Sequence, residues 1–204
     1  MTRWLLIAAV VLVALFVASE LAIPPIAEHR IESRLTDGGG TADVSVGAFP
    51  AARLLFGDGS HISATGRGLN LGLQQETNVL DKLDGFDRVD VSLTAFRAGP
   101  FGVSSFELTR PSASAPYHLV SRARTTPADL TAYGASRLGI PGGPLLRFFG
   151  GQAPGGNQPI PVDLDMNLTS DGGRVVVVSG GGTVAGFPTG PLAALITSTI
   201  VVKL

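Results

Sequence analysis

The tetrapeptide at residues 58–61, Asp-Gly-Ser-His, places a carboxylate, a hydroxyl and an imidazole within four positions. These are the side-chain types of a hydrolase in which a histidine activates a serine nucleophile. Adjacency in the chain does not create triad geometry, and Asp, Gly and Ser are also the common residues of turns. We therefore expect a turn here, and a hydrolase that uses Ser60 and His61 is a lesser hypothesis.

Two groups of carboxylates have a spacing that could serve a cation or acid–base chemistry. Four aspartates recur every third residue: Asp81, Asp84, Asp87 and Asp90. They lack the glycine and the terminal glutamate of an EF-hand loop, so a solvated face explains them. Asp163 and Asp165 share one face of a predicted strand, and strand alternation accounts for that pair without chemistry.

The remaining ligand types and motifs also predict no catalytic, cofactor or metal site. The chain has no cysteine, and its three histidines are scattered without metal-ligand spacing. Gly180, Gly182 and Ala185 follow a valine run with the spacing of a dinucleotide-binding fingerprint. That fingerprint needs a helix after the glycines, and the sequence Gly-Phe-Pro-Thr-Gly-Pro that follows blocks one.

The composition describes one folded domain with an apolar bias. The chain has 204 residues, of which 45% are hydrophobic and 15% charged, so disorder is not expected. The formal net charge is −1 and the signs are interspersed. Without a basic stripe the chain is not expected to bind nucleic acid.

The N-terminus carries the strongest signal. Arg3 precedes an uncharged run from Trp4 to Ser19, which as a helix is about 24 Å long. This length suits a signal peptide or a short signal anchor. No clean cleavage site follows, so we favour an anchor. The position of Arg3 then directs the remainder out of the cytoplasm. We expect residues 1–23 to form the anchor or signal peptide and residues 24–204 an extracytoplasmic domain at the plasma membrane.

The pattern of the domain predicts the α+β class. Ala27, Ile31 and Leu35 form an apolar helical stripe after Pro24 and Pro25, which end the anchor or begin the next helix. Alternating patterns predict antiparallel strands; they lie at 43–46, 60–73, 87–96 and 160–168, with weaker ones at 102–109 and 116–123. Residues 66–68 interrupt the second pattern, which indicates a bend.

Further details of these elements can be predicted. In the strand at 87–96, we expect Val89, Val91, Leu93 and Ala95 to share the buried face. Residues 169–173 predict a hairpin turn into the strand that begins at Arg174. Thr126 is the predicted N-cap of a second helix, which extends to residue 139.

Two oily segments fall between these elements, each with one arginine. The ten residues we expect to contact lipid are Phe49, Arg53, Leu54, Leu55 and Phe56 in the first segment and Leu145, Leu146, Arg147, Phe148 and Phe149 in the second. Each segment either closes the protein core or faces a lipid, with the arginine at the phosphate. Exposing a chain of about 16 carbons costs on the order of 13 kcal/mol, so a lipid carrier needs a comparable apolar channel.

Four stretches, at residues 23–35, 42–69, 86–96 and 125–139, together resemble the LmeA-like phospholipid-binding family of actinobacterial cell envelopes. The resemblance covers most of residues 22–190. It implies a twisted sheet wrapped around amphipathic helices, similar to tubular lipid-binding folds. It also implies phospholipid binding at the membrane, a supporting role in envelope glycolipid maintenance, and no catalysis.

The sequence therefore predicts a membrane-tethered, extracytoplasmic protein that binds a phospholipid or another membrane lipid and is not an enzyme. A non-enzymatic scaffold or interaction domain of the cell envelope is the alternative. A continuous apolar tunnel would favour the lipid carrier, whereas a filled interior would favour the scaffold.

Overall fold

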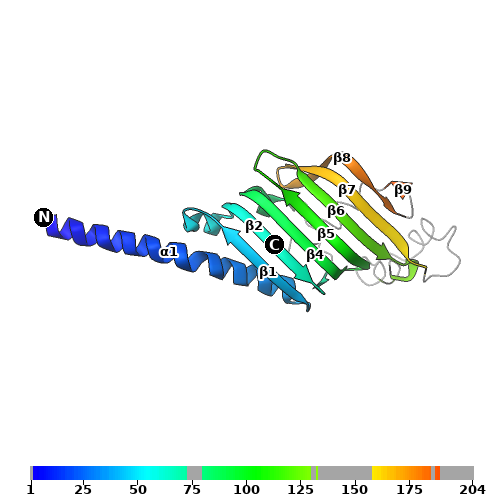
Figure 1. Cartoon of the computed structure of the whole chain (residues 1–204), viewed down its shortest axis with the longest axis horizontal. Coiled ribbons are helices and arrows are strands. Elements are labelled where there is room, and N and C mark those ends of the chain that lie inside the picture. Colours follow the sequence, from blue (N-terminus) through cyan, green and yellow to red (C-terminus); the bar gives the residue numbers. More distant parts are fainter. Residues whose placement is uncertain (1, 73–79, 130–131, 133–157, 185–186, 189–204) are drawn as a thin grey trace.

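A long helix and a broad sheet make up the protein, as Figure 1 shows. The computed structural model describes residues 2–72, 80–129, 132, 158–184 and 187–188. The helix α1 (Thr2–Thr36) runs along one edge of the sheet, and its N-terminal half projects beyond it.

The apolar N-terminal segment and the amphipathic segment form one continuous helix. Pro24 and Pro25 lie inside α1, so the prediction that they separate two helices is wrong. A proline lacks the N–H that a helix needs, which leaves the carbonyls of Glu20 and Leu21 without intrahelical donors. Packing keeps the second half in line, because Leu35 is fully buried and the rest of the predicted apolar stripe lies against the core.

In the described part of the chain, nine strands form a single open sheet beside α1. They are β1 (Thr41–Gly47), β2 (Gly59–Arg67), β3 (Asn70–Leu71), β4 (Phe86–Ala98), β5 (Phe101–Arg110), β6 (Tyr117–Thr125), β7 (Ile160–Asp171), β8 (Arg174–Val184) and β9 (Phe187–Pro188). The spatial order is β1-β2-β4-β5-β6-β7-β8-β9, and β3 pairs with β4. The predicted α+β class is confirmed.

The sheet is mixed, so the prediction of a wholly antiparallel sheet is wrong. β2 and β3 both pair with β4 in parallel, and Gly59 of β2 lies opposite Phe86 of β4. After β3 the chain returns to the end where β2 began and passes through a one-turn helix, α2 (Asp81–Asp84), before β4 starts. The predicted bend is confirmed at Gly68, whose φ of 67° separates β2 from β3.

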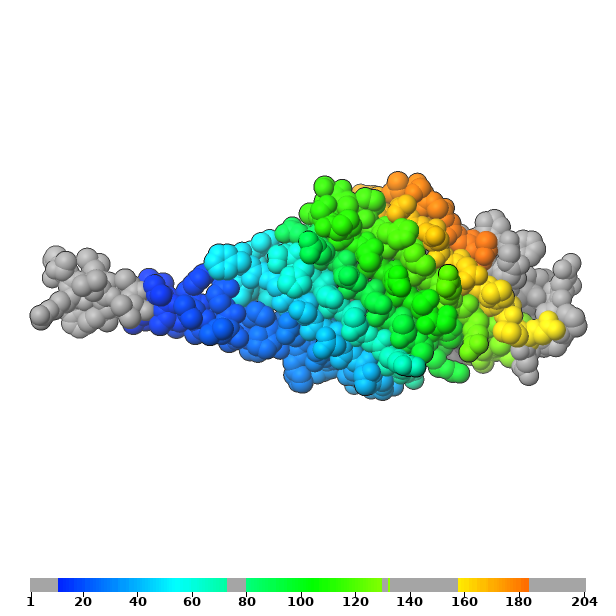
Figure 2. Space-filling model, in the orientation of Figure 1, coloured from blue at the N-terminus to red at the C-terminus, as the bar shows by residue number. Residues whose placement is uncertain are grey.

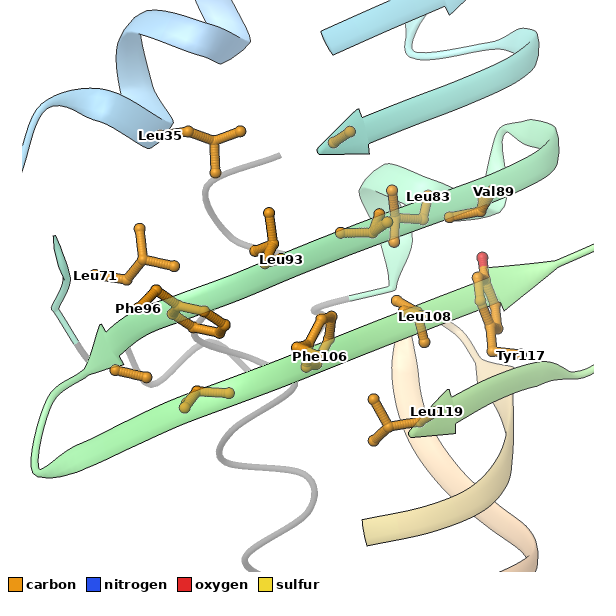
Figure 3. Close-up of a cluster of buried hydrophobic side chains, with 14 of the residues drawn as sticks. Leu35, Leu71, Leu83, Val89, Leu93, Phe96, Phe106, Leu108, Tyr117 and Leu119 are labelled. Carbon is orange, nitrogen blue, oxygen red and sulfur yellow. The ribbon is translucent and has the colours of Figure 1, made fainter. Parts of the chain in front are cut away.

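One face of the sheet carries the hydrophobic core, as Figure 3 shows around β4, β5 and β6. Val91, Leu93, Phe106, Leu108 and Leu119 have no exposed surface. Each alternates with outward-facing polar residues, which is the pattern of a sheet with one buried face. Leu35 of α1 and Leu83 of α2 approach the same cluster (Figure 3).

The alternation of β4 changes phase at Ala95, which corrects one prediction. Val89, Val91 and Leu93 are buried as expected, but Ala95 is exposed and Phe96 is buried in its place. Ala95 has a φ of 49°, in the left-handed region, and this local backbone change turns the following side chains over.

β7 and β8 form the predicted hairpin, and β8 also contains the glycines of the rejected nucleotide-binding motif. Gly172 and Gly173, with φ of 58° and 81°, form the two-residue turn between these strands. β8 then continues through Gly180 and Gly182, so these glycines belong to a strand rather than a phosphate-binding turn. A Cβ at Gly180 would lie 2.4 Å from the Asp165 carbonyl oxygen, which explains why glycine is needed there.

Candidate lipid-binding site

The helix α1 is bound to the sheet through glutamates. Glu28 and Glu32 accept hydrogen bonds from the backbone N–H groups of Val46 and Val44, at 3.0 and 3.2 Å. β1 is an edge strand, and these N–H groups would otherwise be unpaired on its open side. The carboxylates therefore cover the edge and hold the helix at a defined position along it.

A third glutamate binds the turn that follows β1. Glu20 accepts a hydrogen bond from the backbone N–H of Ala51 at 2.8 Å. One helical turn earlier, the ring of Phe16 meets the ring of Phe49 edge-on, with centroids 6.1 Å apart. The turn therefore lies directly beside the apolar part of α1.

This turn is the 3₁₀ helix η1 (Ala51–Phe56), and its apolar side chains divide between the core and solvent. Ala51 is fully buried and Leu54 packs against the core. Phe49, Leu55 and Phe56 are 74%, 71% and 84% exposed. Closure of the core thus holds for Leu54, whereas contact of the three exposed residues with lipid stays a prediction. We call Phe49, Leu55 and Phe56 the apolar tip.

Glycine and the neighbouring strands keep the apolar tip turned outward. Gly57 adopts a φ of 78° after η1, and its N–H bonds to the carbonyl of Leu54 at 3.2 Å. This left-handed residue ends the turn and returns the chain to β2. Figure 2 shows the turn projecting beside α1, at the end of the sheet nearer the N-terminal half of the helix.

A cavity of about 720 Å³ lies at the other end of the sheet, by the hairpin that joins β4 and β5. Its volume is within the range of about 300–1,000 Å³ typical of small-ligand sites. Outward-facing Arg97, Gly102, Ser104 and Arg124 line it, and almost fully buried apolar residues such as Phe101 border it. It is a local pocket with a polar rim.

Two arginines of this cavity flank a glycine in one row across the sheet. Arg97 of β4 lies opposite Gly102 of β5, which in turn lies opposite Arg124 of β6. The two arginines are therefore two strand spacings, or about 10 Å, apart at Cα. Among the residues that the structure describes, neither guanidinium has an ion-pair partner. This pair can bind an anion such as phosphate.

The described residues do not complete a catalytic triad at Ser60 and His61. Ser60 Oγ donates to the carbonyl of Gly47 at 2.9 Å, and its distance to His61 Nδ1 is 3.4 Å. Asp58 makes no side-chain hydrogen bond to His61 within the described residues. In the described part of the chain, no group of three His, Asp or Glu side chains is placed to hold a metal ion.

A buried polar cluster lies between α2 and the strands β4 to β7. Arg110 donates to the carbonyls of Leu83, at 3.0 Å, and of Phe86, and its Nη1 lies 3.6 Å from the Asp84 carboxylate. Tyr117 donates to the same carboxylate at 2.9 Å, and burial raises the pKa of this phenol above its ordinary value. Each of these three side chains has a protein partner, and only the buried Nε of Arg110 lacks one among the described residues, so we assign the cluster to stability.

The other predicted lipid contacts have mixed outcomes. Arg53 is half-buried in η1, beside the apolar tip. The second oily segment, with Leu145, Leu146, Arg147, Phe148 and Phe149, lies outside the described residues. Sequence reasoning missed the pair Arg97 and Arg124, because cross-strand neighbours are not visible without the strand register. It also missed the roles of Glu20, Glu28 and Glu32, although two of them are one helical turn apart.

A one-sided sheet bound to an apolar helix, with an apolar tip beside that helix, offers surfaces that can contact lipid. The comparison with known families agrees: residues 18–198 match the LmeA-like phospholipid-binding family. The chain belongs to this family, which supports a lipid-binding role and confirms the resemblance drawn from the sequence. No curated protein and no solved structure matches the chain.

Proposed function

We propose that the chain is a membrane-tethered, extracytoplasmic protein that binds phospholipid without catalysing a reaction, as a lipid carrier or as a factor in envelope glycolipid maintenance. Family membership supports the lipid-binding part. The tether, the side of the membrane and the cellular role are our proposal.

The proposal rests on the different surroundings of the two ends of α1. Its segment from Val11 is long and apolar enough to cross a membrane, and none of the most apolar window is buried in the protein. Leu35, at the other end of the same helix, is fully buried in the core of the sheet. Because both segments belong to one continuous helix, an anchored N-terminal half would hold the lipid-binding domain at the membrane surface.

The cavity beside Arg97 and Arg124 is our candidate for the phospholipid headgroup. Charge-assisted bonds from guanidinium to phosphate are stronger than neutral hydrogen bonds and can be bidentate. Gly102 between the two arginines has no side chain, which leaves space above the backbone for a phosphate. The Asp129 carboxylate, at the cavity rim, would attract an amine or hydroxyl of the headgroup rather than its phosphate.

Native mass spectrometry of the full chain in mild detergent, after incubation with phospholipid vesicles, tests this function. We expect one bound phospholipid and, for Arg97→Gln with Arg124→Gln, a loss of affinity of at least about tenfold. Arg88→Gln with Arg174→Gln removes the same charge from exposed positions outside the cavity and should bind normally. An absence of phospholipid on the unmodified chain would refute the function, and equal binding by both double variants would refute this site.

An interaction domain for another envelope protein is the second candidate. Val176, Val177 and Val178 of β8 are between 42% and 61% exposed, which is unusual for consecutive valines. The same mass spectrometry separates the two candidates, because a pure interaction domain would carry no phospholipid under any condition.

A further inference from the structure

We propose that the apolar tip, formed by Phe49, Leu55 and Phe56, inserts into the leaflet that α1 enters, so that the domain contacts the bilayer at a second point. This inference rests on the tether proposed above. The tip would then lie at the boundary between lipid headgroups and acyl chains. The protein would bind its membrane in one fixed orientation.

The position of the tip along α1 is the first argument. Phe16 contacts Phe49, and Glu20 holds the N–H of Ala51, so the tip lies at the level of helix residues 16–20. The uncharged run of the sequence ends at Ser19. If Glu20 marks the polar boundary of the bilayer, Phe16 lies about 6 Å below it, at 1.5 Å per residue. Interfacial apolar groups are typically buried to about 5–10 Å.

The second argument is that the tip and the helix expose one continuous apolar surface. Leu12, Leu15 and Phe16 of α1 are 69%, 64% and 46% exposed, and Phe49 of the tip contacts the ring of Phe16. The helix surface needs an apolar environment by its composition. A bilayer that covers it also covers side chains packed beside it, because no polar group separates Phe16 from Phe49.

The third argument is that the tip is held rigidly rather than carried on a free loop. Glu28 and Glu32 bind β1, Glu20 binds the start of η1, and Leu54 inside η1 packs against the core. The tip therefore cannot withdraw without breaking contacts of the fold. Arg53 belongs to the same turn and brings a guanidinium to the headgroup level, where lipid phosphates are available.

Depth-dependent fluorescence quenching tests the inference on the full chain. The sequence has no cysteine, so single cysteines can be labelled directly with an environment-sensitive fluorophore. The protein is reconstituted into vesicles of equal parts phosphatidylcholine and phosphatidylglycerol that contain spin-labelled lipid. Phe56→Cys and Leu55→Cys report on the tip, and Ser33→Cys is the matched control on the exposed side of α1. Ser33 lies thirteen residues beyond Glu20, or about 20 Å along the helix axis.

We expect a spin label near the headgroup to quench both tip positions more strongly than the Ser33 position, because interfacial apolar groups lie about 5–10 Å deep. Equal quenching of tip and control would overturn the inference. A second result would also overturn it. If the tip labels are shielded from water but not quenched by the lipid spin label, and if they transfer energy between protein molecules, the tip contacts a second copy of the chain.

A label at Leu12→Cys separates this inference from the tether. If a spin label deep in the acyl region quenches it while the tip positions match Ser33, the anchor is present and the inserted tip is wrong. If the Leu12 position is also unquenched, the proposed tether fails, and the inserted tip fails with it. Retained phospholipid binding in mass spectrometry would show that the lipid-binding function survives either result.

Discussion

The Glu28 carboxylate of α1 accepts a hydrogen bond from the backbone N–H of Val46 on β1, at 3.0 Å. Together with the bond from Val44 to Glu32, it replaces the neighbouring strand that the sheet lacks on this side. An open sheet would otherwise offer this edge to another chain. The helix that carries the apolar N-terminal segment is thus also the cover of the sheet edge.

Replacement of these glutamates should loosen the edge. We expect Glu28→Ala with Glu32→Ala to cost about 1 kcal/mol per lost bond, which is roughly a fivefold faster amide exchange. Hydrogen exchange of residues 41–47, followed by mass spectrometry, measures this. Glu28→Gln with Glu32→Gln keeps an acceptor oxygen at each position and should show a smaller change. Unchanged exchange in the alanine variant would contradict the assignment.

Arg110 should be a strong determinant of stability. It is 4% exposed, and it faces the Asp84 carboxylate and the carbonyls of Leu83 and Phe86. Removal of one partner of a buried ion pair typically costs about 3–5 kcal/mol, so we expect Arg110→Met to lower the unfolding free energy by this amount. Chemical unfolding in detergent, followed by circular dichroism, measures it.

The exposed Arg88 is the matched control for this variant, and Arg88→Met should change stability by less than about 0.5 kcal/mol. A second variant identifies the cause. If Asp84 is left with an uncompensated charge in Arg110→Met, the addition of Asp84→Asn should recover part of the loss. A double variant no more stable than Arg110→Met would attribute the loss to packing.

Tyr117 should make stability fall in strongly alkaline solution. Burial raises the pKa of its phenol in the folded state, so the folded protein keeps the proton that the unfolded chain loses near pH 10. The stabilisation is complete below this pH and decreases as the pH rises above it. Denaturant unfolding at a series of pH values should therefore show a shallower alkaline decline for Tyr117→Phe. The other tyrosine, Tyr133, is present in both proteins and cancels.

Tyr117→Phe should also lose stability at neutral pH. The hydroxyl donates to the Asp84 carboxylate, and hydrogen bonds to charged groups contribute about 1.5–3 kcal/mol. The Arg110 guanidinium lies 4.5 Å from the ring centroid, and phenylalanine preserves this contact. A variant as stable as the unmodified chain would show that the hydroxyl makes no net contribution.

Replacement of Ser60 and His61 separates binding from hydrolysis. If the protein acts without catalysis, Ser60→Ala and His61→Ala should both leave phospholipid binding unchanged within about twofold, since both residues lie outside the lining of the cavity proposed for the headgroup. Thin-layer chromatography of the incubated lipids detects any hydrolysis. Release of fatty acid by the unmodified chain, abolished in Ser60→Ala, would establish the hydrolase instead.

Much of the fold could be predicted from local patterns. Alternation predicted β1, β2, β4 and β7, and the glycine pair predicted the hairpin into β8. Thr126 accepts the N–H of Asp129 at 3.0 Å, as predicted for an N-cap, and most of the helix predicted to residue 139 lies outside the described residues. The parallel pairing of β2 with β4 could not be predicted, because alternation has no direction. Nor could the phase change at Ala95, since nothing in that residue type favours a left-handed backbone.

For the candidate site, the sequence alone established an apolar helix, an oily turn after β1 and a chain without thiolate chemistry. These properties depend only on which residue types follow one another. Which residues of the turn face outward, which glutamates cover an edge and which arginines share a row depended on the folded chain. These relationships join residues such as Glu32 with Val44, Phe16 with Phe49, and Arg97 with Arg124, across 12 or more positions. Packing and strand register create them, and neither exists until the chain has folded.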